Sequence, residues 1–143
     1  FDCYKFRSMN LNPAAHLEQV SKNDPRITRV GRFLRKTSID ELPQFINVFL
    51  GQMSVVGPRP HMVSHTEMYA QRVNKFMVRH FVKPGITGLA QTKGYRGEVE
   101  KETDIINRVK YDIFYMENWS ILLDIKIIFM TIFNTIKGED KAY

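Results

Sequence analysis

The segment from Asn118 to Lys137 constrains the fold most, because it predicts a helix that is apolar on nearly every side. Its polar side chains form one narrow seam: Ser120, Asp124, Thr131, Asn134 and Thr135. A helix of this kind is buried or faces lipid. A domain of 143 residues has little protein with which to surround it, so we expect contact with a membrane interface. Lys126 and Lys137 lie together on another side, where their long stems can follow the apolar surface.

The composition is that of one folded domain, residues 1–143, with an anionic partner. A hydrophobic content of 43% and a charged content of 25% are ordinary for a folded chain. The net charge of +6 favours nucleic acid, a membrane surface or a phosphorylated substrate as partner. The chain begins with Phe1, and no apolar stretch reaches the ~20 residues of a spanning helix. We therefore expect a fragment of a longer protein.

Two adjacent carboxylates, Asp40 and Glu41, stand at a second predicted helix start. Ser38 and Glu41 have the spacing of a capping box, and the alternative makes Asp40 the N-cap with Pro43 at the third helical position. Both registers predict the same helix, which ends at Gly51 and carries one apolar face: Leu42, Phe45, Ile46 and Phe49.

Acidic residues are common in first helical turns for electrostatic reasons alone. The free N–H groups of a helix start also favour phosphate binding. Two carboxylates beside a bound phosphate need a divalent cation or arginines to offset the repulsion. We expect such partners around Asp40 and Glu41.

The residues before this pair predict a basic amphipathic helix that starts near Pro25. Its apolar stripe comprises Ile27, Val30, Phe33 and Leu34, and its basic residues are Arg26, Arg29, Arg32, Arg35 and Lys36. Such a helix usually exposes a solvated face and less often binds a membrane surface or phosphate. Because it leads directly into Asp40, we expect Arg35 to orient the carboxylate or to neutralise a bound phosphate through its bidentate guanidinium.

The remaining periodicity predicts an α+β fold, a mostly helical single domain with a small short-stranded sheet and amphipathic helices at a membrane interface. An edge-like strand is predicted over residues 1–9 and a short strand over 52–56. Helices are predicted over 62–81, with Tyr69, Val73, Phe76 and Met77 inward, and over 98–116, with Ile105, Ile106, Val109 and Ile113 inward. A short helix is also possible at 14–20.

Arg59 stands between Pro58 and Pro60, which fix φ on either side of it. A turn of this composition usually has no further role. An arginine held stiffly on both sides is nevertheless well suited to clamp a phosphate. His61 and His65 follow, and without a third ligand of suitable spacing we expect ordinary polar histidines.

The run RVGRFLRKTSIDELPQFINVFLGQMSVVGPRP, residues 29–60, resembles the signature of the bacterial sugar transferase family, the monotopic phosphoglycosyl transferases. KFRSM at 5–9, VKPGITG at 82–88 and YMENWSILLDIKIIFMTIF at 115–133 fit the same family in the same order. The run from VGPRPHMVSHTE to FMVRHFVKPGITG is most similar to members that load glucose 1-phosphate onto undecaprenyl phosphate.

The resemblance implies an enzyme that moves a phosphosugar from UDP-glucose or UDP-galactose to undecaprenyl phosphate, with loss of UMP. This is the first membrane step of capsule and exopolysaccharide assembly, at the cytoplasmic face of the bacterial inner membrane. Asp40 matches the family's nucleophile, which forms a covalent aspartyl intermediate. Glu41 is expected to bind Mg²⁺ with Asp40 and to accept a proton from the acceptor, while Arg35 and Arg59 stabilise the transferred charge.

The resemblance also implies several substrate contacts. Lys5 and Arg7 belong to a segment that enters the active-site region in the family, and Arg96 lies near the nucleotide-sugar site. This chain has Gly88-Leu89-Ala90-Gln91 where the family commonly has Gly-Trp-Ala-Gln, and it has Gly94-Tyr95-Arg96 near a frequent Asn-Gly-Arg turn. Family members carry a hydrophobic re-entrant helix upstream.

The rival hypothesis is a non-enzymatic basic module that binds nucleic acid or an anionic membrane. The arginine-rich helix and the net positive charge allow it. The acidic pair beside the basic stretch and the lack of a recognisable nucleic-acid motif count against it. We therefore expect no nucleic-acid partner.

Overall fold

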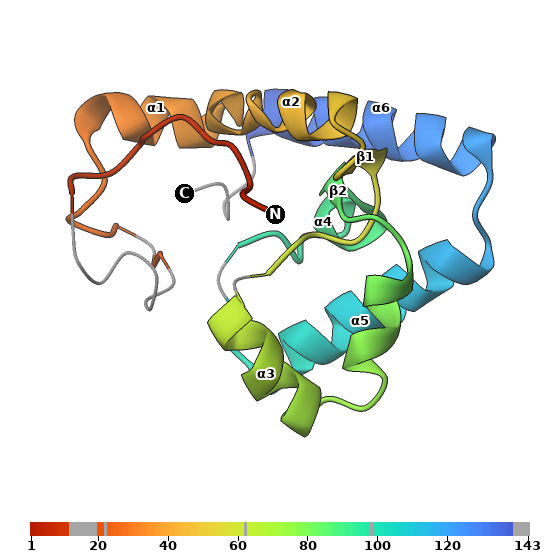
Figure 1. Ribbon diagram of the computed structural model, residues 1–143. Coiled ribbons are helices and arrows are strands. Elements are labelled where there is room, and N and C mark those ends of the chain that lie inside the picture. Colours follow the sequence, from red (N-terminus) through yellow and green to blue (C-terminus); the bar gives the residue numbers. More distant parts are fainter. Residues whose placement is uncertain (12–19, 22, 62, 98, 139–143) are drawn as a thin grey trace.

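The centre of the fold is a pair of short parallel strands (Figure 1). The computed structural model describes residues 1–11, 20–21, 23–61, 63–97 and 99–138. In it, β1 (Ser54–Val56) pairs with β2 (Gly85–Thr87), and Val56 lies opposite Thr87. The strand predicted over 52–56 is confirmed, and so is the α+β class with a small sheet. Parallel neighbours need a crossover connection, which α3 (Val63–Arg72) and the 3₁₀ helix η3 (Phe76–Phe81) supply.

Helices cover this sheet on two sides. Along the upper edge in Figure 1 lie α1 (Arg29–Lys36), α2 (Gln44–Phe49) and α6 (Ile121–Lys137). On the other side α5 (Glu102–Glu117) packs against η3, and the short α4 (Leu89–Thr92) contacts both α5 and α6.

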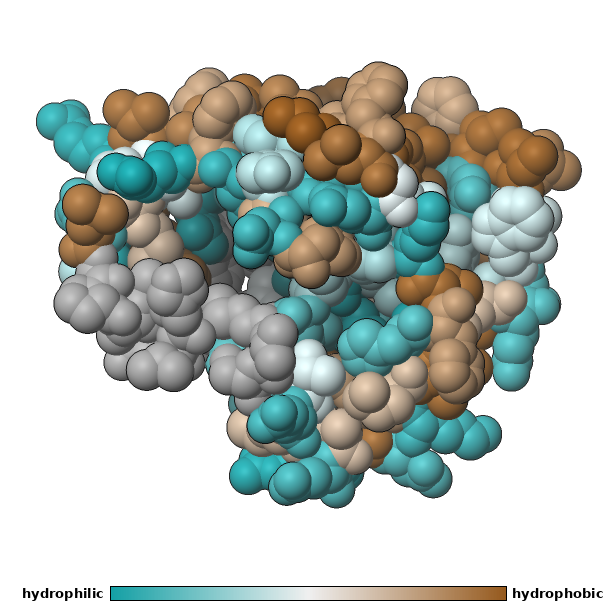
Figure 2. All heavy atoms as spheres, viewed as in Figure 1, coloured by the Kyte–Doolittle hydropathy of each residue, from teal (hydrophilic) through white to brown (hydrophobic). Residues whose placement is uncertain are grey.

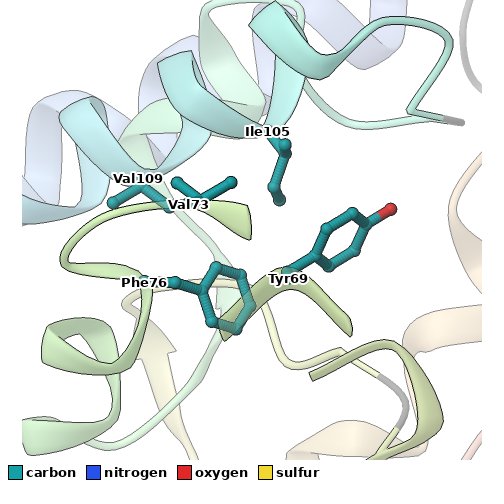
Figure 3. Close-up of a cluster of buried hydrophobic side chains, with 5 residues drawn as sticks. All are labelled: Tyr69, Val73, Phe76, Ile105 and Val109. Atoms are coloured by element: carbon teal, nitrogen blue, oxygen red, sulfur yellow. The ribbon is translucent and has the colours of Figure 1, made fainter. Parts of the chain in front are cut away.

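Two apolar clusters form the core. The first joins α3, η3 and α5 through Tyr69, Val73, Phe76, Ile105 and Val109, which point toward one another in Figure 3. The second joins the sheet to α4, α5 and α6 through Val56, Leu89, Tyr115 and Ile127. The inward faces predicted for the two helices are confirmed except at Met77, which is exposed.

The narrow polar seam of α6 attaches this helix to the domain. Ser120 caps it, since the Leu123 N–H donates to Ser120 Oγ at 3.1 Å. Three further polar groups of the seam reach inward: Asp124 accepts from Tyr115 at 2.8 Å, Thr131 lies 2.6 Å from Thr87, and Asn134 donates to the Thr92 carbonyl at 3.1 Å. Ile127 is fully buried, and Leu123 and Ile128 pack against the second core cluster, while most other apolar side chains of the helix are exposed.

An apolar face runs along the outer side of the three upper helices, and Figure 2 shows it as brown side chains along the upper edge. We call it the apolar face; its exposed members are Val30, Phe33, Leu42, Phe45, Ile46, Phe49, Leu50, Ile121, Leu122, Ile125, Phe129, Ile132, Phe133 and Ile136. Phe49 is 91% exposed. Contiguous exposed apolar surface of this kind marks an interaction site. No helix among the described residues combines the length and apolarity required to cross a bilayer.

The strand predicted over residues 1–9 is wrong. The segment forms only an isolated bridge between Met9 and Ile27, because its backbone bonds go to scattered partners rather than to a strand. Thr28 N–H, for example, donates to the Ser8 carbonyl at 3.1 Å. The segment lies directly on α1 at Gly31, where a Cβ would fall 1.9 Å from the Ser8 oxygen.

Two helix boundaries also differ from prediction. The basic helix begins at Arg29 and not near Pro25, because Thr28 caps it by accepting from the Gly31 N–H at 2.9 Å. The helix predicted over 62–81 is split into α3 and η3 by Lys75, which adopts a left-handed φ of 61°. The possible helix at 14–20 lies outside the described residues, except for its last position.

Candidate active site

The two carboxylates lie on a tight 3₁₀ turn, η2 (Ile39–Glu41), between α1 and α2. Ser38 enters this turn with a left-handed φ of 59°, and its side chain makes no capping hydrogen bond. Pro43 is the residue that caps α2. Both predicted capping registers are therefore wrong. The turn draws Asp40 and Glu41 inward, to 7% and 6% exposure, instead of leaving them at a helix N-terminus.

Glu41 is held by three cations from distant parts of the chain. Lys5 Nζ lies 3.1 Å and Arg59 Nη2 2.6 Å from Oε1, while Arg96 Nη2 lies 3.3 Å from Oε2. Burial would raise the pKa of Glu41, but the charges of Arg59, Lys5 and Arg96 outweigh it and hold the pKa well below its usual range. Glu41 thus remains ionised and holds the three cations close together.

Asp40 has a different environment, although it is the next residue. Within the described part of the chain, no hydrogen bond or ion pair reaches its carboxylate; only its backbone carbonyl is bound, by the Phe6 N–H at 2.9 Å. Burial, followed by the charge of Glu41, raises the pKa of Asp40, against the opposing charges of Lys5, Arg35 and Arg96. Asp40 therefore presents unshared carboxylate oxygens next to a cluster of cations.

The other two predicted residues differ in their placement. Arg35 Nη1 donates to Ser8 Oγ at 3.2 Å, and the negative charges of Asp40 and Glu41 counteract the lowering of its pKa by burial. Arg35 thus lies beside the acidic pair. Arg7 is exposed, and the structure gives it no ion pair or hydrogen bond within the described residues.

A small cavity of about 80 Å³ opens beside Glu41 and Arg96. Two buried polar atoms on its lining residues, Ser38 Oγ and Gln91 Oε1, lack a hydrogen-bond partner among the described residues. Buried polar atoms are usually satisfied. A polar ligand or water in the cavity would satisfy them, next to the segment expected to contact the nucleotide sugar.

The residues fit a magnesium ion only in part. Among the described residues, no three His, Cys, Asp or Glu side chains are grouped as metal ligands. Both Glu41 oxygens are taken by cations, which leaves Asp40 as the available carboxylate. One carboxylate suffices for Mg²⁺ when substrate phosphates and waters complete the octahedron.

Sequence reasoning did not identify a group of charged residues behind Arg59. Arg79 Nη2 donates to the Arg59 carbonyl at 2.6 Å and lies 2.9 Å from Asp112 Oδ2. One signal for Asp112 was present, because it follows Ile105 and Val109 at helical spacing and so falls on the inward face of α5. A buried charge at such a position requires a partner.

Over residues 1–138 the chain matches the family described as bacterial sugar transferase. A UDP-glucose:undecaprenyl-phosphate glucose-1-phosphate transferase of Klebsiella pneumoniae is 56% identical over 131 residues, 91% of this chain and 28% of the relative. A UDP-galactose-lipid carrier transferase of Erwinia amylovora is 46% identical over 159 aligned positions, 100% of this chain and 31% of the relative. The exopolysaccharide production protein PSS of Rhizobium leguminosarum bv. phaseoli is 46% identical over 134 residues, which are 90% of this chain and 67% of the relative.

The chain spans less than a third of the length of the Klebsiella and Erwinia relatives. The family match covers all the residues that form the site described above. These matches confirm the family inferred from the sequence motifs: the chain belongs to the bacterial sugar transferase family.

Proposed function

We propose that the protein transfers glucose 1-phosphate, or galactose 1-phosphate, from the UDP-sugar to undecaprenyl phosphate through a covalent intermediate on Asp40. The observation that carries this proposal is the contrast within the acidic pair. Glu41 is bound by three cations, while the adjacent Asp40 carboxylate is unshared. The names of the relatives, which specify glucose and galactose donors, support the choice of substrates.

In the first step an Asp40 carboxylate oxygen attacks the sugar-bearing phosphorus of the UDP-sugar. The bond from this phosphorus to the bridging oxygen breaks, and UMP leaves with the electron pair. Phosphoryl transfer depends mainly on positioning and charge neutralisation. Arg59, Lys5 and Arg96 would neutralise this charge while they remain paired with Glu41. Asp40 must be ionised to attack, and its raised pKa makes its oxygens more nucleophilic than those of Glu41.

In the second step an oxygen of undecaprenyl phosphate attacks the same phosphorus. The bond to Asp40 breaks, the carboxylate is regenerated and undecaprenyl diphosphate sugar is formed. The lowered pKa of Glu41 makes it a poor proton acceptor, contrary to the role expected from the family resemblance. A phosphate monoester with a second pKa near ~6 is largely a dianion at neutral pH and needs no base.

Mg²⁺ fits this proposal with Asp40 and the donor phosphates as its ligands. When bound, the ion neutralises charge on the phosphoryl oxygens. Glu41 would act by holding the cations, since its oxygens are already occupied.

The apolar face would rest on the membrane, and the cytoplasmic face of the inner membrane is where UDP-sugars and the lipid acceptor meet. Glu41 is followed directly by Leu42, an exposed member of this face. The acceptor phosphate would therefore reach the site from the bilayer surface without leaving the membrane. Interfacial helices bind through buried apolar area together with attraction to anionic lipid, and the net charge of +6 supports the latter.

The test incubates the intact protein with radiolabelled UDP-glucose, UDP-galactose and other UDP-sugars, each with undecaprenyl phosphate and Mg²⁺. We expect labelled undecaprenyl diphosphate sugar from one of the first two donors, and none from Asp40→Asn. Transfer at the wild-type rate by Asp40→Asn would exclude the aspartyl intermediate. Absence of labelled lipid with every donor would exclude the proposed reaction.

A further inference from the structure

A layer of charged and polar side chains, buried except for the half-buried His61, lies behind the arginines that hold Glu41. It consists of His61, Arg79 on η3, and Arg108 and Asp112 on α5. Arg79 is 4% and Asp112 2% exposed. Burying such charges costs free energy of folding unless they are paired and hydrogen-bonded. The partners of these side chains therefore indicate which role they have in the site.

Arg79 joins three groups with one guanidinium. Its Nη2 donates to the Arg59 carbonyl at 2.6 Å and approaches Asp112 Oδ2 at 2.9 Å, as an ion pair without hydrogen-bond alignment. Its Nη1 lies 2.9 Å from His61 Nδ1. Arg79 therefore holds the chain on both sides of Pro60.

This contact restrains a backbone angle, ψ of Arg59, that the flanking prolines do not fix. Pro58 and Pro60 each fix their own φ, and Pro60 also excludes helical ψ at Arg59. Within the extended region that remains, ψ of Arg59 sets the direction of its carbonyl. Anchoring this carbonyl to Arg79 therefore restrains the backbone from which the Arg59 side chain reaches Glu41 Oε1, 2.6 Å away.

Arg108 makes the corresponding contact on the other loop. Its Nη2 donates to the carbonyl of Gly97, the residue after Arg96. Its Nη1 lies 3.4 Å from His61 Nε2. His61 thus stands between the two buried arginines, and burial together with their charges lowers its pKa to about 2.

We propose that Arg79 and Arg108, bridged by His61 and with Asp112 as counter-charge, are positioning residues that aim Arg59 and Arg96 at Glu41 and the transferred phosphate. This inference rests on the proposed function. It extends that function to residues that do not touch the acidic pair. Each buried arginine acts through the backbone of a loop that carries a site arginine.

The test compares single and double variants of the intact protein in the lipid-transfer assay. Arg79→Lys keeps the charge that Asp112 needs, but an ammonium cannot span three partners as the planar fork does. We expect kcat to fall about tenfold with little change in KM for the UDP-sugar. In an Arg59→Lys background, we expect Arg79→Lys to lower kcat less than about twofold further, because both changes act on one guanidinium. Arg108→Lys is expected to show the same dependence on Arg96→Lys.

Val109→Ala is the matched control. It removes apolar contacts from the same helix, α5, and its side chain belongs to the first core cluster. It should lower the melting temperature at least as much as Arg79→Lys and leave kcat unchanged. Independent losses from Arg79→Lys and Arg59→Lys, or a kcat that follows melting temperature across all variants, would overturn the proposal.

A second measurement separates this proposal from the proposed function. Melting temperatures of Arg59→Ala, Glu41→Gln and the double variant give the coupling between these two side chains. We expect this coupling to weaken when Arg79 is replaced by lysine, whether or not transfer occurs. Unchanged coupling would contradict the positioning role, whereas absence of transfer by the wild-type protein would contradict only the proposed reaction.

Discussion

At the scale of residues, two neighbouring carboxylates differ because their surroundings differ. Glu41 meets Lys5, Arg59 and Arg96, whereas Asp40 keeps its oxygens unshared among the described residues. Burial, followed by the charge of Glu41, raises the pKa of Asp40, whereas the charges of Arg59, Lys5 and Arg96 outweigh burial and lower the pKa of Glu41. Two neighbouring carboxylates whose pKa values are shifted apart can take different roles in a reaction.

Arg59→Lys should impair transfer nearly as much as Arg59→Ala, with each lowering kcat by about a hundredfold. The Arg59 guanidinium contacts both Glu41 oxygens, at 2.6 and 3.4 Å, and an ammonium cannot reproduce this geometry. Steady-state kinetics of the two variants provides the comparison. If lysine restores most of the activity, Arg59 contributes only general positive charge.

Lys5→Ala should move the acid limb of the pH–rate profile to higher pH. Lys5 is the foremost of the charges that oppose the raised pKa of Asp40. Removing this cation raises the pKa further, so Asp40 remains protonated and inactive up to a higher pH. The profile of kcat/KM for the UDP-sugar measures the shift.

Arg7→Ala is the control for this shift, since Arg7 has the same sign and lies two residues further along the same segment. Its exposed side chain has no ion pair or hydrogen bond within the described part of the chain, and we expect the acid limb to stay in place. An equal shift in both variants would show a general effect of net charge and not a local one at Asp40.

At the scale of elements, periodicity predicted the helices well but said little about the turn that forms the site. The polar seam of α6 and the inward residues of α5 were predicted from the sequence, because each face follows from helical spacing alone, but the inward direction of the seam was found only in the structure. The η2 turn depends on a left-handed Ser38, a conformation that local sequence preference disfavours. The capping-box spacing therefore gave the wrong local structure around Asp40 and Glu41.

Contacts between distant segments were also beyond the reach of the sequence pattern. Lys5 and Arg7 alternate along the sequence and were expected to share a face of a strand, yet only Lys5 reaches Glu41. The Phe6 N–H, between these two residues, donates to the Asp40 carbonyl at 2.9 Å and so attaches the segment to the acidic pair, a long-range contact that no sequence pattern predicts. Arg79 lies in an apolar run, and its partners Arg59 and Asp112 become neighbours only through the packing of η3 on α5.

Phe133→Glu on α6 should weaken binding of the intact protein to anionic vesicles without a large loss of stability. Phe133 is an exposed member of the apolar face, so a carboxylate there lowers apolar area and adds repulsion from lipid headgroups. Vesicle cosedimentation and a thermal melt give the two readouts.

Thr131→Val on the same helix is the matched control. It removes the inward hydrogen bond to Thr87, which should cost about 1 kcal/mol of folding free energy and leave vesicle binding unchanged. The reverse pattern, with Phe133→Glu destabilising and Thr131→Val weakening binding, would mean that the apolar face is covered by protein and not by lipid.

At the scale of the whole molecule, the site and the apolar face meet at consecutive residues, Glu41 and Leu42. The upper helices α1, α2 and α6 share this face, while η3 and α5 brace the site from the other side (Figure 1). In the proposed reaction this arrangement would present the cations around Glu41 to a phosphate at the bilayer surface, while the polar layer supports them from within the domain.

The 143-residue chain alone should fold, bind anionic vesicles weakly and lose this binding as salt rises. One interfacial surface gives reversible binding and usually needs a second anchor. We expect little or no transfer to undecaprenyl phosphate from this chain, even with UDP-sugar and Mg²⁺. Assaying it beside the intact protein on the same lipid gives the comparison, and equal turnover would show that the site needs no further anchor.

The covalent role of Asp40 is tested most directly by trapping the intermediate. The intact protein is mixed with radiolabelled UDP-glucose, and in parallel with UDP-galactose, in the presence of Mg²⁺ and the absence of lipid acceptor. It is then quenched and digested for mass spectrometry. We predict release of UMP and a hexose phosphate attached to the peptide that contains Asp40, which disappears when undecaprenyl phosphate is added. Asp40→Asn should carry no adduct, and Glu41→Gln should form it slowly on Asp40. An adduct on another residue, or full transfer to lipid without UMP release before the acceptor is added, would contradict the account.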